Sequence, residues 1–162
     1  MTALISRILL CLLLVCSFAG EARADAGPAV VQAGRVTDEA GLFTVEQKRV
    51  LSEKLERLEQ STRHQMVVVT VSSLGGAEIG PFTTALGNEW GIGRKGHNDG
   101  VVLLVAPQEQ LAQISVGVGL EAVLPDELCQ SIMNERMIPR FREGDLFGGV
   151  DAGVDALIER LD

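Results

Sequence analysis

The hydrophobic positions in the first half of the chain follow a helical period. Thr44 and Gln47 have the spacing of a capping box, in which each side chain binds the other residue's backbone N–H. An apolar stripe at helical spacing follows this cap. The pattern predicts a helix that begins at Thr44 and frays near residues 61–62, with its buried face formed by Leu51, Leu55 and Leu58.

Two later segments are apolar without a helical period. Residues 65–71, QMVVVTV, and residues 101–106 are rich in β-branched and aliphatic side chains. Such runs are typical of strands that are covered on both faces. Residues 107–110 can turn the chain back, and the mixed pattern of residues 111–118 then predicts a third strand at an edge of the sheet.

Three further helices follow from the spacing of apolar residues. We expect one from about Ile79 to Trp90, where Pro81 is tolerated in the first turn. Another spans residues 126–137, Pro139 interrupts it, and the last helix runs over residues 145–161.

This order of elements predicts an α/β fold. Helices that separate buried strands favour a three-layer sandwich, with a mostly parallel central sheet and helices on both faces. We assign residues 36–162 to one α/β domain. Residues 25–35, DAGPAVVQAGR, are expected to form a flexible leader before it.

The first 24 residues have the pattern of a secretory signal peptide. Arg7 precedes an apolar run over residues 8–19, and Ala22 and Ala24 form a small-x-small cleavage motif before Asp25. The alternatives are an uncleaved anchor or, more weakly, a lipoprotein acylated at Cys16. The signal predicts export across the inner membrane, most simply to the periplasm.

The net charge limits the classes of binding partner, and the cysteine content limits the candidate nucleophiles. The net charge is −8, which keeps a protein in solution and argues against nucleic acid or anionic lipid as a partner. No segment after the signal is long and apolar enough to predict a stable membrane span. Cleavage would leave only Cys129, which on a predicted helix is expected to be a small buried residue rather than a nucleophile.

Several segments together resemble the TPM domain family. The resemblance spans Gly34 to Leu161 and is carried by five motifs in the same order, which makes it more specific than any single motif. These motifs are GRVTDEAGLF (34–43), HQMVVVTVSSLGG (64–76), NEWGIGRKGHNDGVVLLVA (88–106), ISVGVGLEAVLPD (114–126) and IPRFREGDLFGGVDAGVDALI (138–158).

The resemblance implies a three-layer α/β fold outside the cytoplasm and a cluster of acidic residues that binds a divalent cation, calcium in some members. It also implies an acid phosphatase activity, which is ascribed to the plant thylakoid-lumen type. Many bacterial members continue into a membrane helix or a low-complexity tail, whereas this sequence stops at Asp162. Smaller departures from the family pattern are Arg63, Val118 and Ala122.

Three acidic residues are expected to meet at one end of the sheet. If residues 101–106 and 111–118 form a hairpin, Asp99 before the first strand approaches Glu121 and Asp126 after the second. Carboxylates gathered without lysines favour a bound cation, Ca²⁺ first and Mg²⁺ second. The alternatives are local: Asp99 can stabilise a turn, and Asp126 and Asp145 can cap helices.

Asp38 joins this predicted metal set by resemblance only. It is the prominent acid of the first motif, VTDEAG. The expected topology does not place Asp38 beside Asp99, because the first helix should begin at the opposite end of the sheet.

The sequence supports two main functions. One is an accessory or binding module of the cell envelope that contacts an envelope protein. The alternative is a metal-dependent acid phosphatase, in which Arg94, Lys95 and His97 beside Asp99 bind phosphate. His64 is expected to be structural. A scaffold without any ligand is a weaker third possibility.

Overall fold

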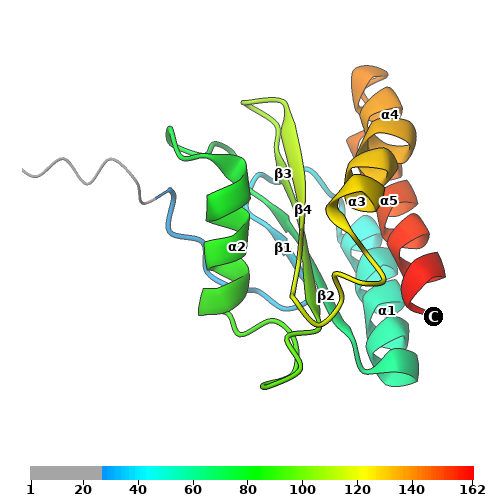
Figure 1. Ribbon diagram of the computed structural model, residues 1–162. Helices are drawn as coiled ribbons and strands as arrows, with labels where there is room; N and C mark the ends of the chain where they lie inside the picture. Colours follow the sequence, from blue (N-terminus) through cyan, green and yellow to red (C-terminus); the bar gives the residue numbers. More distant parts are fainter. Residues whose placement is uncertain (1–26) are drawn as a thin grey trace, which may run out of the picture.

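A four-stranded sheet lies at the centre of the protein, as the computed structural model shows for residues 27–162. Its order is β1 (Val36–Asp38), β2 (Gln65–Thr70), β3 (Gly100–Ala106) and β4 (Leu111–Val116) (Figure 1). β1, β2 and β3 run parallel, and β3 and β4 form an antiparallel hairpin. The sheet is therefore mostly parallel, as predicted.

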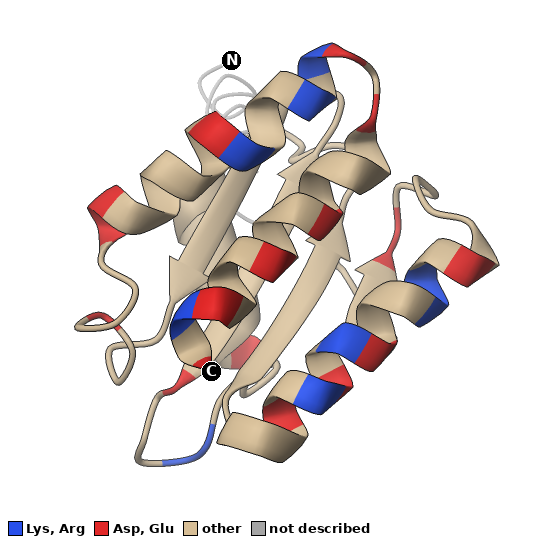
Figure 2. Ribbon diagram, turned by 90° about the vertical axis from the view of Figure 1, so that its right-hand side faces the viewer, with Lys and Arg blue, Asp and Glu red and all other residues tan. Residues whose placement is uncertain are grey.

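Helices occupy both faces of this sheet. One face is covered by α1 (Val45–Thr62), α5 (Leu146–Leu161) and the continuous segment formed by α3 (Asp126–Ile132), the π-helical η1 (Met133–Met137) and α4 (Ile138–Arg142). α2 (Ile79–Glu89) packs on the other face, over β3 and β4. Figure 2 shows the three helical segments of the first face side by side. The three-layer α/β fold is confirmed.

Local sequence explains where the helices begin. Thr44 caps α1 through a capping box with Gln47, and Asp145 caps α5 by accepting from the N–H of Gly148 at 2.8 Å. The buried residues of α1 are the predicted stripe Leu51, Leu55 and Leu58. These caps determine where α1 and α5 begin, and the leucine stripe determines the face that α1 turns to the sheet.

The predicted break at Pro139 is wrong. The chain remains helical from Asp126 to Arg142, because the π-helical turn η1 lies just before the proline, which occupies the first turn of α4. A π-turn changes the i→i−4 pattern locally, so the missing N–H and the ring of proline are accommodated without ending the helix. Asp126 is also not a cap: Pro125 occupies that position, and Asp126 is the first helical residue.

The N-terminal segment that precedes the domain packs against it. Residues 27–35 form no helix or strand, but Val30 contacts the apolar cluster beneath α2, and Thr37 accepts from the N–H of Ala33 at 3.0 Å. The strand β1 then follows, and no sequence pattern had indicated it. The predicted signal peptide, residues 1–24, lies outside the described residues.

Within residues 27–162, no helix is long and apolar enough to cross a membrane.

Candidate functional site

Asp99 is the most constrained acidic side chain at the amino end of the parallel strands. It directly precedes β3 and is only 3% exposed. One carboxylate oxygen accepts from the backbone N–H of Arg94 at 2.7 Å, and the other lies 2.6–2.7 Å from the Arg94 guanidinium nitrogens. The Nδ1 atom of His64 is 3.3 Å from that second oxygen. Asp99 therefore closes the loop that begins at Arg94 and joins it to the start of β2.

These contacts shift the acidity of Asp99. Burial alone would raise the pKa of this carboxyl, but the backbone N–H and guanidinium of Arg94, together with His64, lower it to about 2. The carboxylate is consequently charged at any physiological pH, and both of its oxygens already have partners. The turn-stabilising role considered from the sequence describes this geometry.

The β3–β4 hairpin brings the segment that carries Glu121 next to the Asp99 loop, as predicted. The N–H of Gly119 donates to the carbonyl of Asn98 at 3.0 Å. A Cβ on Gly119 would lie 1.9 Å from the His97 carbonyl oxygen, so only glycine permits this approach. Glu121 and Asp126 are nevertheless exposed, and in the described part of the chain neither makes a side-chain hydrogen bond or ion pair.

Asp38 lies at the opposite end of the sheet. It ends β1, and its register partner in β2 is Thr70, whereas the residue after Asp99 pairs with Gln65 at the start of β2. The Asp38 carboxylate accepts from the hydroxyl of Thr70 at 2.6 Å. It also accepts from the N–H groups of Leu42 and Phe43 at 2.9 and 3.0 Å. These bonds fix the turn between β1 and α1.

The four carboxylates of the predicted metal set therefore do not fit around a single ion. Asp38 and Asp99 are separated by the length of the strands, and hydrogen bonds occupy both carboxylates. No group of three or more Asp, Glu, His or Cys side chains among residues 27–162 is arranged to hold a metal ion.

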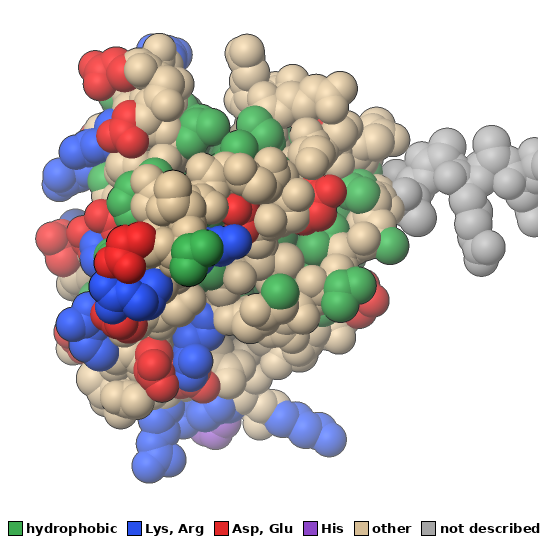
Figure 3. All heavy atoms as spheres, turned by 180° about the vertical axis from the view of Figure 1, so that it is seen from behind, with side chains coloured by type: hydrophobic (Ala, Val, Ile, Leu, Met, Phe, Trp, Pro, Cys, Tyr) green, Lys and Arg blue, Asp and Glu red, His purple; other side chains and the backbone are tan. Residues whose placement is uncertain are grey.

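A cationic surface surrounds the closed Asp99 loop. Arg63, Lys95 and His97 are exposed at this end of the molecule, and Arg94 is half-buried. Figure 3 shows Lys, Arg and His side chains gathered at the lower end of the protein, where acidic side chains are sparse. This end contrasts with the net charge of −8 for the whole chain.

Two glutamates at the carboxyl end of the strands were not singled out from the sequence. Glu39 accepts from the N–H of Ser72 at 2.6 Å, and Glu109 accepts from Ser73 Oγ and the N–H of Leu74 at 2.7 and 2.8 Å. Both carboxylates bind the loop after β2. No local pattern could reveal them, since each contact joins residues more than thirty positions apart.

The fold, with the Asp99 loop beside the β3–β4 hairpin, defines a class of mixed α/β sandwich domain. The chain belongs to the TPM domain family, whose sequence model matches residues 36–160. No curated protein matches the sequence.

Solved structures share the fold. The N-terminal domain of a protein from P. gingivalis is 38% identical, with 78% of this chain and 81% of that one covered and a TM-score of 0.74. The N-terminal domain of the cg2496 protein from Corynebacterium glutamicum is 16% identical, with 83% and 84% covered and a TM-score of 0.63. The BA42 protein from Bizionia argentinensis is 15% identical, with 74% and 81% covered and a TM-score of 0.63. The latter two likenesses concern the fold alone.

Proposed function

We propose that this protein is an exported accessory module of the bacterial cell envelope that binds a protein partner in the periplasm. The observation that carries the proposal is that both carboxylate oxygens of Asp99 have hydrogen-bond partners within the protein. Because its oxygens are occupied by Arg94 and His64, this carboxylate holds the loop of residues 94–99 in place instead of facing an open reaction centre. The signal-like N-terminus and membership of the TPM family support export and a place in the envelope.

Expression of the full chain in a Gram-negative host tests export. We expect the protein in the periplasmic extract, with an intact mass that begins at Asp25. A chain of full-length mass in the cytoplasm would contradict the proposal. A chain of full-length mass in the membrane fraction would instead support the uncleaved anchor.

Binding of Ca²⁺, or of Mg²⁺ as second choice, stays a prediction. Glu121 and Asp126 are the two exposed members of the acidic set, so the test compares wild type with a Glu121→Gln, Asp126→Asn double variant. If calcium binds there, millimolar Ca²⁺ raises the melting temperature of wild type more than that of the variant. An unchanged wild-type melting temperature would contradict calcium binding.

Acid phosphatase activity is the second candidate function. One observation favours it: Lys95 and His97 are exposed beside Arg94, where their charge can stabilise a phosphoryl group. The assay supplies p-nitrophenyl phosphate with Ca²⁺, Mg²⁺ or Mn²⁺ at acidic and neutral pH. A binding module shows no turnover above the blank, whereas turnover that is lost in Lys95→Ala and His97→Ala variants would replace our proposal by the phosphatase.

A further inference from the structure

The outer edge of β4 offers backbone groups for another strand. β4 is the last strand of the sheet, and in Figure 1 it lies nearest the viewer, between α2 and α3. The N–H of Gly117 donates to the carbonyl of Gly100 in β3. The backbone N–H and C=O groups of every second residue before Gly117 therefore also point to β3. The intervening residues Ala112, Ile114 and Val116 therefore present N–H and C=O groups to the outer edge. Among residues 27–162, the Gln113 side chain bonds the Ile114 carbonyl at 3.1 Å, and no backbone group pairs with these N–H groups.

This edge lacks the usual protection against strand pairing. The sequence of β4, LAQISV, contains no charged residue and no proline, and its six residues pair with β3 in continuous register without a bulge. Natural edge strands are commonly blocked by charges, prolines or bulges, because an open edge pairs with other chains. An unblocked edge of this length is therefore suited to strand addition.

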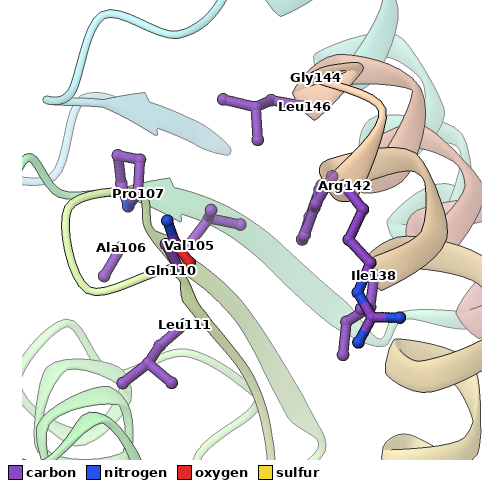
Figure 4. A pocket seen from close by; sticks show the side chains of 10 residues that line it. Val105, Ala106, Pro107, Gln110, Leu111, Ile138, Arg142, Gly144 and Leu146 are labelled. Atoms are coloured by element: carbon purple, nitrogen blue, oxygen red, sulfur yellow. The ribbon is translucent and has the colours of Figure 1, made fainter.

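A cavity of about 530 Å³ lies at the start of β4. It opens between the turn that joins β3 to β4 and the junction of α4 with α5 (Figure 4). Its volume lies within the range of small-ligand sites. The walls are mainly apolar, formed among others by Val105, Ala106, Leu111, Ile138, Phe141 and Leu146.

The cavity has one charged wall residue. Arg142 lines it from α4, and Gln110 adds an amide from the hairpin turn. Arg142 is exposed, and its guanidinium makes no ion pair or hydrogen bond with any described residue. An apolar cavity with one free guanidinium is complementary to a group that combines an apolar side chain with a single carboxylate.

The direction of the added strand shows that this carboxylate is the C-terminus of a peptide. A segment that pairs antiparallel with β4 runs towards Leu111, so its C-terminal end reaches the cavity and Arg142. A parallel segment would bring an N-terminal ammonium there, which Arg142 repels. Ala112 packs on the face of the sheet that α1, α5 and the α3–α4 segment cover. The added residue opposite Ala112 therefore points its side chain to that same face, where Ile138 and Phe141 line the cavity.

We propose that the β4 edge and this cavity bind the extended C-terminal segment of a partner protein. The segment pairs antiparallel with β4, its last apolar side chain enters the cavity, and its terminal carboxylate binds Arg142. This inference rests on the proposed binding function and gives the partner a chemistry.

The probe is a fluorescein-labelled pool of degenerate hexapeptides with Val, Ile, Leu or Phe in the last position and a free carboxylate. The same pool with an amidated C-terminus is the control. Fluorescence polarisation with the exported protein should show saturable binding of the free acids and about tenfold weaker binding of the amides, since a hydrogen bond to a charged group is lost. Equal binding of both pools, or binding of neither, overturns the proposal.

Two variants and one control variant locate the site. Arg142→Ala should weaken binding by about tenfold, whereas Arg140→Ala should leave it unchanged, because Arg140 is exposed on the same helix but does not line the cavity. Ala112→Pro removes an outward N–H and should abolish binding. Circular dichroism checks its folding, and the Arg142 comparison decides the matter where that variant does not fold. Unchanged affinity in Arg142→Ala overturns the proposal.

A second copy of this chain is the competing occupant of the edge. Light scattering after size exclusion should show a monomer. A dimer that Ala112→Pro dissociates would assign the edge to self-association and overturn the peptide proposal. If the protein is exported but does not bind the peptides, the peptide proposal fails and the proposed envelope function stands. If the protein binds the peptides but is not exported, only the assignment to the cell envelope fails.

Discussion

Individual side chains in this protein act mainly as clamps on loops. Asp99 and Asp38 hold turns at opposite ends of the sheet, and each accepts hydrogen bonds from backbone N–H groups. A buried carboxylate without partners would be costly, so these bonds are required for the acidic residues to lie where they do. The oxygens of Asp38 and Asp99, which the sequence suggested as metal ligands, thus accept hydrogen bonds within the fold.

Replacement of Asp99 should have a pH-dependent cost. The folded pKa of about 2 lies below the ordinary value of 3.8, so the charged carboxylate stabilises the fold above pH 4. This contribution, about 2 kcal/mol, is lost as the pH falls through the folded pKa. We expect Asp99→Asn to lower the free energy of unfolding by about that amount at pH 7, and the gap to wild type to narrow between pH 4 and pH 2. Urea denaturation at several pH values measures it.

Asp126→Asn is the matched control, because Asp126 is exposed and unbonded within the described residues. It should change the free energy of unfolding by less than about 0.5 kcal/mol. A gap between wild type and Asp99→Asn that stays constant down to pH 2 would contradict the role of the Arg94 contact.

Thr70 permits a separate test of the Asp38 turn. Its hydroxyl is fully buried, donates to Asp38 at 2.6 Å and accepts from the N–H of Ala40 at 3.2 Å. Thr70→Val removes one partner from the Asp38 carboxylate and one from the Ala40 N–H. It should lower the free energy of unfolding by about 1–3 kcal/mol. The urea midpoint should fall with an unchanged slope. The Thr84 hydroxyl bonds Ser115 Oγ at 2.7 Å but is exposed, so water can replace that partner and Thr84→Val should have little effect. Equal losses in the two variants would refute the argument.

At the scale of elements, α5 crosses the α3–α4 segment at two glycines. A Cβ on Gly149 would lie 2.4 Å from the Phe141 ring and 3.0 Å from the carbonyl oxygen of Met137. A Cβ on Gly153 would lie 2.6 Å from the Met137 sulfur. The two helices therefore approach more closely than side chains would allow, which brings Phe141 and Arg142 to the wall of the cavity.

Gly149→Ala should destabilise the fold despite the better helix propensity of alanine. Overpacking against Phe141 and the Met137 carbonyl is expected to cost about 1–3 kcal/mol. Gly80→Ala in the first turn of α2 is the comparison. Apart from its chain neighbours no atom lies within 4 Å of its Cβ, and the helix preference of alanine is offset by the crowding that Pro81 imposes on the residue before it. It should change the free energy of unfolding by less than about 0.5 kcal/mol. Thermal unfolding should therefore show a clear fall for Gly149→Ala alone, and a stabilising Gly149→Ala would show that the helices separate without cost.

The sequence predicted most elements because their signals are local. The Thr44 cap, the leucine stripe of α1 and the apolar runs of β2 and β3 are each contained in one segment. β1 has only three residues, too few for a periodic pattern, and the π-turn before Pro139, which packs against α5, follows no local sequence pattern. The hairpin that carries Glu121 to the Asp99 loop was predictable, but the Arg94 partner of Asp99 was not assigned.

At the scale of the whole molecule, the two faces of the sheet are covered unequally. Three helical segments cover one face, and Lys54 of α1 binds Asp151 and Asp155 of α5 at 2.6 Å across that layer. The other face has only α2, which packs over β3 and β4. Residues 27–35 complete the cover there, where Val30 packs on the cluster that includes Val67 and Val69.

This arrangement makes the segment before β1 part of the folded domain, and two adjacent valines test it. Val30 is half-buried against the α2-side cluster, whereas Val31 is 84% exposed. Val30→Ala should lower the free energy of unfolding by about 1 kcal/mol, from the apolar area returned to water, and Val31→Ala should change it by less than about 0.5 kcal/mol. Chemical denaturation of both variants measures the difference. Equal stabilities of the two variants would mean that the Val30 contact adds nothing to the fold, and that this side chain does not help α2 to cover the sheet.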